Sequence, residues 1–115
     1  MGSVQHTASL LKALSHPARL EIARILRQGE ACVCHLEAHL GYRQPYISQQ
    51  IMVLRKAGLV VERRDGTYVF YRLADPRVVN LLDTLLPEPV GKRRPVPGRV
   101  PCSCPVCAQM MEARV

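Results

Sequence analysis

The five cysteines are the residues of this sequence best suited to chemistry, and they fall into two groups. Cys32 and Cys34 flank a single valine, and a second group near the C-terminus contains Cys102, Cys104 and Cys107. The N-terminus lacks the basic region and apolar run of a secretory signal, so we expect a cytoplasmic protein with reduced thiols. An odd number of clustered cysteines there indicates metal or redox chemistry rather than a disulfide framework.

The spacing of Cys32 and Cys34 sets a geometric condition on a shared ligand. The sequence predicts a short helix over residues 32–40, and residues two apart on a regular α-helix point about 200° apart. Both thiolates bind one metal only if the start of this helix unwinds or bends, and that distortion would be a two-state switch. A helix N-terminus also lowers the pKa of a thiol, which favours thiolate ligands. The alternative is that both cysteines simply fill the core.

The C-terminal cysteines offer a third ligand for such a site, and the alternative is that they bind a metal by themselves. They follow a segment rich in Pro and Arg, residues 87–101, which predicts a semi-rigid linker spanning roughly 45 Å. Three thiolates without a fourth ligand suit As(III), Sb(III) or Pb(II) better than structural zinc, with Cd(II) and Hg(II) as alternatives. A further alternative is a mixed site on one helix face, formed by Cys32, His35 and His39.

Length and charge limit the class of protein. The chain has 115 residues, a formal net charge of +7 and an isoelectric point near 9.6. A single domain of this length buries a core without disulfides, and its positive charge favours nucleic acid as a partner. No segment has the length of a membrane span. No His–acid pair accompanies a cysteine at motif spacing, so we expect a protein that is not an enzyme.

Five helices and one β-hairpin are predicted to position these residues. Apolar periodicity and boundary residues predict helices over residues 4–14, 17–28, 32–40, 44–57 and 76–86. A two-residue turn at Asp65-Gly66 is predicted to join the strands, residues 59–64 and 67–73. The predicted fold class is therefore mainly α with a hairpin, in the order ααααββα over residues 1–86, followed by the linker and a tail at residues 102–115. The last helix carries more apolar surface than it can hide alone, which predicts a homodimer.

The fourth predicted helix and the hairpin form a candidate interface with double-stranded DNA. A helix fits the major groove, where polar side chains near its N-terminus reach base edges. The amides and hydroxyls suited to base contacts are those of Gln44, Tyr46, Ser48 and Gln49. Cations are expected to contact phosphate or the minor groove, from Lys56 at the helix end and from Arg63 and Arg64 beside the turn. For each of these residues, a solvated surface position is the alternative.

These segments together resemble the ArsR/SmtB family of bacterial metal-responsive repressors. The resemblance covers about two-thirds of the chain and is carried by Leu14-Ser-His-Pro-Ala-Arg-Leu20, Cys32-Val-Cys34-His-Leu36, Gln44-Pro-Tyr-Ile-Ser-Gln-Gln-Ile51, Leu54-Arg-Lys-Ala-Gly-Leu59 and Tyr68-Val-Phe-Tyr-Arg-Leu73. It implies a winged helix-turn-helix fold and a homodimer held by the first and last helices. It also implies a repressor that leaves its operator when metal binds.

The Cys-Val-Cys motif is similar to that of the arsenic- and cadmium-responsive members of this family. The resemblance implies As(III) or Sb(III) as the effector, with Cd(II), Pb(II) or Zn(II) as alternatives. Those members often carry a third cysteine where this chain has Glu37, so the C-terminal cysteines are expected to complete the site. The second hypothesis is a thiol-redox or persulfide-sensing repressor on the same fold, in which Cys32 or Cys34 pairs with a C-terminal cysteine.

Overall fold

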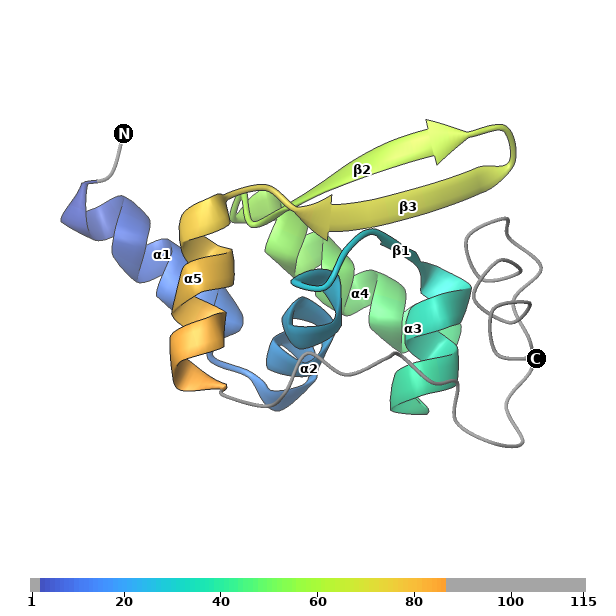
Figure 1. The fold of residues 1–115 in the computed structure, drawn as a ribbon, viewed down its shortest axis with the longest axis horizontal. Helices are drawn as coiled ribbons and strands as arrows, with labels where there is room; N and C mark the ends of the chain where they lie inside the picture. The colour runs from blue at the N-terminus through green and yellow to red at the C-terminus, as the bar shows by residue number, and fades with distance from the viewer. Residues whose placement is uncertain (1–2, 87–115) are drawn as a thin grey trace.

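The structure is a computed structural model that describes residues 3–86. The predicted linker at residues 87–101 and the cysteine-rich tail at residues 102–115 lie outside the described residues. In chain order the elements are α1 (Val4–Leu14), α2 (Pro17–Leu26), β1 (Ala31–Cys32), α3 (Val33–Leu40), α4 (Gln44–Lys56), β2 (Val60–Asp65), β3 (Tyr68–Leu73) and α5 (Pro76–Leu85) (Figure 1).

The predicted order of five helices and a hairpin is confirmed, with one added element. The sequence places Cys32 in the third helix, but the structure has a two-residue strand there, β1. This strand pairs antiparallel with β3, with Ala31 opposite Tyr71 and Cys32 opposite Phe70, and gives a three-stranded sheet of order β1-β3-β2. Two buried residues carry no readable strand periodicity, so β1 could not be predicted from the sequence.

The turn of the hairpin lies one residue later than predicted. Asp65 is still paired with Tyr68, so the turn residues are Gly66 and Thr67. Of these two, only Gly66 has a positive φ, at 63°. The predicted type I′ turn at Asp65-Gly66 is therefore wrong, because that turn requires positive φ at both central residues. We call the β2–β3 hairpin the wing.

Local sequence signals explain where the helices begin. The Ser3 hydroxyl accepts a hydrogen bond from the His6 amide at the start of α1, and His16 Nδ1 accepts one from the Ala18 amide at the start of α2. Asp75 caps α5 in the same way, by accepting from the Arg77 amide. These caps satisfy amides that have no partner inside a helix.

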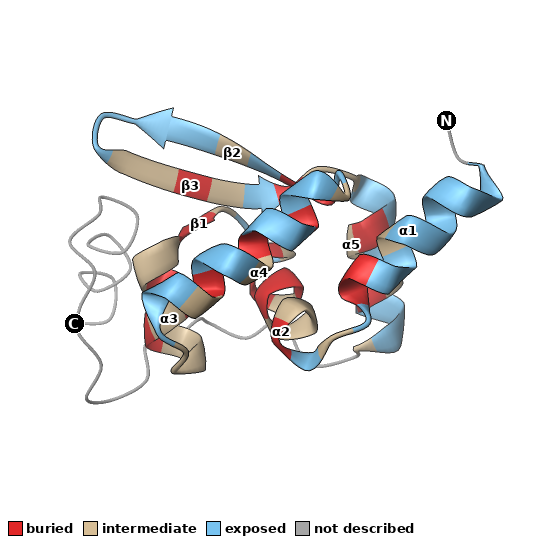
Figure 2. Cartoon of the chain, turned by 180° about the vertical axis from the view of Figure 1, so that it is seen from behind, coloured by how far each residue is buried: buried red, intermediate tan, exposed pale blue. Residues whose placement is uncertain are grey.

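The core lies between α2, α4 and the base of the sheet (Figure 2). The predicted inner face of α4 is confirmed, because Ile47, Ile51 and Leu54 are buried. The inner face of α2 is also confirmed, at Ile22, Ile25 and Leu26. Burying this stripe fixes the rotation of α4 and leaves its opposite face exposed to solvent, as the pale blue ribbon of Figure 2 shows.

The first and last helices lie beside each other at one end of the molecule, away from the tip of the wing (Figure 1). They line a mainly apolar groove with Leu10, Leu11, Leu14, Val78 and Leu81. Along this end Leu11 is half-exposed, and Leu85 is 63% exposed. Within residues 3–86, none of the helices is long and apolar enough to cross a membrane.

Candidate DNA-binding face and cysteine site

The exposed face of α4 carries the residues predicted to contact DNA bases. Gln44, Ser48 and Gln49 are exposed on the side opposite the buried stripe. Tyr46 is half-buried, and its ring centroid lies 5.1 Å from that of Tyr42 in a tilted contact. The N-terminal half of α4 therefore exposes three polar side chains, and the Tyr46 ring lies beside them in contact with Tyr42. Lys56 is exposed at the far end of the helix. These DNA contacts stay predictions.

Gln50 has a structural contact that sequence reasoning missed. Its side-chain oxygen accepts a hydrogen bond from Arg19 Nη1 at 2.9 Å, and Arg19 Nε donates to the carbonyl of Ala13 at the end of α1. Arg19 therefore ties α4 to α1 and α2. No local pattern reveals this bond, because its partners lie far apart in the sequence.

Within the wing, Arg63 is engaged by protein atoms. Arg63 Nε and Nη2 donate to the two carboxylate oxygens of Glu30 at 2.8 and 2.7 Å. The guanidinium also lies over the Phe70 ring, 4.7 Å from its centroid. The hydrogen bonds from Arg63 hold the pKa of Glu30 below its ordinary value near 4.5. Arg63 thus joins β2 to the segment that enters β1.

Arg64 is the more exposed of the two arginines predicted to meet the DNA backbone. Its side chain is 72% exposed, and it forms a single ion pair with Glu62 at 3.1 Å. The Arg63 side chain is 48% exposed and forms the two-pronged pair with Glu30. A contact between phosphate and Arg64 therefore requires less rearrangement of the protein than a contact between phosphate and Arg63. Both DNA contacts stay predictions.

The Cys32 and Cys34 side chains, which we call the sulfur pair, converge at the start of α3. Cys32 is the N-cap residue of α3 with an extended backbone, at φ −92° and ψ 168°, and Cys34 lies in the first turn. The two Sγ atoms are 2.9 Å apart. The prediction that the helix must unwind before both sulfurs meet is wrong. Pairing with β3 already holds Cys32 outside the helix, so the 200° separation does not apply.

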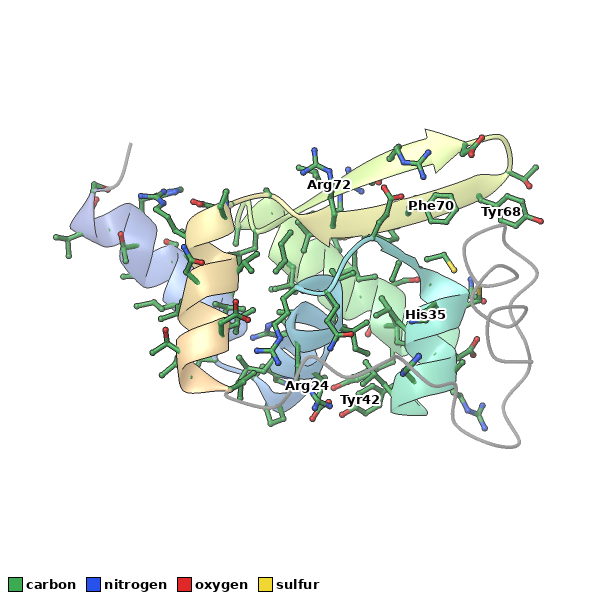
Figure 3. The ribbon with its side chains drawn as sticks, in the orientation of Figure 1. Arg24, His35, Tyr42, Tyr68, Phe70 and Arg72 are labelled. Atoms are coloured by element: carbon green, nitrogen blue, oxygen red, sulfur yellow. The ribbon has the colours of Figure 1, made fainter. Side chains whose placement is uncertain are left out.

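Aromatic rings of β3 cover the sulfur pair. Cys32 is 4% exposed and packs against Phe70, which is 1% exposed, and Cys34 and Tyr68 pack at the edge of this cluster. Figure 3 shows Phe70 and Tyr68 along β3, on the side where the hairpin passes the start of α3. The two sulfurs therefore differ in access, because Cys32 is enclosed while Cys34 is half-buried.

Cys34 is disulfide-bonded, and Cys32 lies enclosed beside it. Cys32 and Cys34 are the only two cysteines within residues 3–86. The predicted ligands Cys102, Cys104 and Cys107 lie outside the described residues.

The alternative of a mixed metal site at Cys32, His35 and His39 is wrong. Residues 3–86 contain no group of three or more Cys, His, Asp or Glu side chains placed to hold a metal ion. The reason is visible in the packing. The His35 ring is buried and stacks on the His39 ring at 4.3 Å, while Cys32 belongs to the cluster around Phe70.

The fold and the exposed face of α4 define a winged helix-turn-helix DNA-binding protein. The sequence profile described as "Bacterial regulatory protein, arsR family" matches residues 16–61. The Biofilm growth-associated repressor of Agrobacterium fabrum is 53% identical over 78 residues, which cover 68% of this chain and 67% of that protein. The chain belongs to the arsR family and is a DNA-binding transcriptional repressor. Its relatives are repressors and not enzymes.

Two solved structures have the same fold. The homodimeric winged helix-turn-helix DNA-binding domain of a Mycobacterium bovis protein has a TM-score of 0.67 and 33% identity, and the match covers 71% of this chain and 76% of that one. Reduced HlyU from Vibrio cholerae has a TM-score of 0.68 and 33% identity, with 74% and 93% covered. The similarity of this chain to the family is therefore clear in both sequence and structure.

We expect Gln49→Ala to weaken binding to the specific operator by roughly 1–3 kcal/mol and to leave binding to random DNA nearly unchanged. The reason is that an exposed amide on α4 can pair with a base edge, whereas it adds no charge toward phosphate. Fluorescence anisotropy with operator and scrambled duplexes at matched salt measures both affinities. Gln50→Ala tests the neighbouring amide that bonds Arg19. Equal losses on the two duplexes for Gln49→Ala would contradict a role in reading bases.

Proposed function

We propose that this repressor binds its operator as a homodimer and releases it when Cys34 forms a disulfide with one of Cys102, Cys104 and Cys107. The observation that carries this proposal is the state of the sulfur pair. Cys34 is disulfide-bonded and half-buried at the start of α3, while the Cys32 thiol is enclosed beside it.

The position of the sulfur pair supports a route to the DNA-binding elements. α3 packs against α4, and Cys32 pairs with Phe70 of the wing through β1. A change of bonding at Cys34 therefore acts on the helix that precedes α4 and on the strand that supports the wing. An effector that favours one arrangement of these elements shifts the equilibrium between bound and free repressor.

The groove between α1 and α5 supports the homodimer. Its lining is mainly apolar, and Leu11 and Leu85 expose further apolar surface along the same end. A second copy would remove that surface from water, which favours association. The M. bovis relative is described as homodimeric. The name of the V. cholerae relative specifies a reduced form, in keeping with thiol chemistry on this fold.

A second candidate function is release on binding As(III) or Sb(III), with Cd(II), Pb(II) or Zn(II) as other effectors of the same thiolates. The convergence of the Cys32 and Cys34 sulfurs favours this metalloid candidate, because the two sulfurs lie 2.9 Å apart and are placed to bind the same ion. A three-coordinate metalloid would take its third thiolate from the C-terminal cysteines. This candidate needs both members of the sulfur pair, whereas the disulfide proposal needs Cys34 alone.

That difference gives the deciding experiment. We expect oxidation of the full chain to weaken operator binding at least tenfold, which corresponds to about 1.4 kcal/mol of coupling. Anisotropy titrations compare wild type, Cys34→Ser and the matched variant Cys32→Ser, each after a disulfide-forming oxidant and each with arsenite under reducing conditions. The proposal predicts that Cys34→Ser abolishes release by the oxidant and that Cys32→Ser retains it. Release by arsenite that both variants abolish would favour the metalloid candidate.

A further inference from the structure

We propose that Met52 is a further specificity-determining residue of the DNA-binding face, and that its side chain contacts the C5-methyl group of a thymine in the major groove. Met52 lies on α4 and is 54% exposed. The proposal rests on the DNA-binding function of the fold and not on the thiol switch, so the two can fail separately. It adds an apolar contact to an interface otherwise predicted from polar and charged side chains.

The position of Met52 on α4 places it among the residues predicted to contact DNA. Residues three and four apart share one face of a helix, so Met52 lies between Gln49 and Lys56, on the side opposite the buried stripe (Figure 2). At 1.5 Å of rise per residue, Met52 lies about 4.5 Å further along the helix than Gln49, which is little more than one base step of ~3.4 Å. A helix in the major groove therefore brings both side chains to neighbouring base pairs.

The surroundings of Met52 match the chemistry of a thymine at the edge of the groove. Met52, Arg55 and Lys56 line a shallow hollow on the surface of α4, so two cationic residues flank an apolar one. The C5-methyl of thymine is the apolar group that the four bases of DNA display in the major groove, and phosphates line both edges of that groove. An apolar side chain next to cations therefore fits this group and its surroundings.

A methionine suits this contact better than a polar side chain of similar length. Its thioether chain is flexible and polarisable, so it can follow an apolar surface of irregular shape. Because the methyl group distinguishes thymine in the groove, burying it against Met52 favours a T·A pair at one position of the site. An exposed apolar side chain is common on protein surfaces, so the test has to address the methyl group itself.

Replacing thymine with deoxyuridine removes only this methyl group and leaves the hydrogen-bonding edge of the base unchanged. The probe is a duplex selected from a random-sequence pool by the wild-type full-length protein, with deoxyuridine then placed at each thymine in turn. At one position of a half-site we expect deoxyuridine to weaken wild-type binding about fourfold, which corresponds to about 0.8 kcal/mol for one buried methyl group. Fluorescence anisotropy under reducing conditions measures the affinities.

Variants of α4 assign the effect to the methionine. Met52→Gln keeps the length of the side chain but loses its apolar end, so this variant should bind the thymine and deoxyuridine duplexes equally. Met52→Leu keeps an apolar side chain and should retain at least a twofold preference for thymine. Val53→Ala is the matched control, because Val53 is 39% exposed on the same helix but points about 100° away from Met52. It should retain the fourfold preference, and circular dichroism confirms that all three variants fold.

The outcomes decide the proposal. Loss of the thymine preference in Met52→Gln, with its retention in Met52→Leu and Val53→Ala, supports the contact. If deoxyuridine weakens wild-type binding at no position, or if Met52→Gln keeps the full preference, Met52 does not contact the methyl group and the proposal is overturned. Loss of the preference in Val53→Ala as well would also overturn it, because the effect would then not belong to one side chain. Since the protein stays reduced throughout, these results do not depend on whether oxidation releases the operator.

Discussion

Replacing Phe70 with alanine is expected to lower the free energy of unfolding by about 3–5 kcal/mol. Phe70 is 1% exposed and lies where three parts of the fold meet. It packs on Cys32, its backbone pairs with β1, and Arg63 stacks over its ring. Truncation leaves a cavity beneath the wing and removes the surface on which Arg63 rests. Urea denaturation followed by circular dichroism measures the loss.

Tyr68 provides the matched control for Phe70. It lies two residues earlier on the same face of β3, with its ring 6.5 Å from that of Phe70, but it is only half-buried. We expect Tyr68→Ala to cost less than half as much, because the hydrophobic contribution follows the apolar area removed from water. Equal losses for the two variants would show that Phe70 is not the residue that holds the wing to β1.

Replacing Arg27 with alanine is expected to lower the free energy of unfolding by about 2–4 kcal/mol. The Arg27 side chain is only 3% exposed and lies 3.4 Å from an Asp83 carboxylate oxygen. Its Nη1 atom donates to the carbonyls of Leu82 and Leu86 at 3.1 and 2.9 Å. The Leu82 carbonyl also accepts from the Leu86 amide, whereas the Leu86 carbonyl lies past the last residue of α5. Loss of the guanidinium removes both of its hydrogen bonds and leaves a cavity at the C-terminal end of α5.

Arg24 is the control for Arg27 on the same helix. It forms an ion pair with Glu21 at 2.6 Å, and its side chain is 30% exposed. Pairs of this kind, one turn apart on a helix surface, contribute at most about 1 kcal/mol. Thermal unfolding of Arg24→Ala should therefore stay close to that of wild type. A similar loss in both variants would mean that Arg27 does not clamp α5.

The helices were predictable from the sequence because their signals are local. The stripe Ile47, Ile51 and Leu54 repeats at helical spacing, and proline or a capping side chain stands at the start of several helices. The same locality explains why the exposed face of α4 could be assigned before its surroundings were known. A buried stripe determines the direction of the opposite face.

The features that escaped prediction depend on residues far apart in the chain. β1 exists because Cys32 pairs with Phe70, and the Arg63–Glu30 pair crosses from β2 to the segment before β1. For the cysteine site, the sequence singled out the two cysteines that the structure brings together but gave the wrong geometry. Helical spacing was applied to Cys32, although the sheet holds that residue in an extended conformation.

The ion pairs of the wing also change how the charge of this chain acts on DNA. Duplex DNA is surrounded by condensed counterions. A cationic side chain releases some of these counterions, which strengthens binding, only when it neutralises a phosphate. Arg63 is bound to Glu30, and Arg55 and Arg64 share Glu62. Within residues 3–86, further exposed cations include Lys56 at the end of α4 and Arg72 on β3, which Figure 3 labels.

The formal charge of +7 therefore overstates the counterions that the folded region can displace. Each phosphate that a protein neutralises steepens the fall of affinity with salt by about 0.9 in logarithmic slope. As long as the wing arginines keep these ion pairs, we expect the folded region to bind random DNA with a shallow dependence on salt. Affinity for the operator would then depend chiefly on the polar side chains of α4 that are predicted to contact bases.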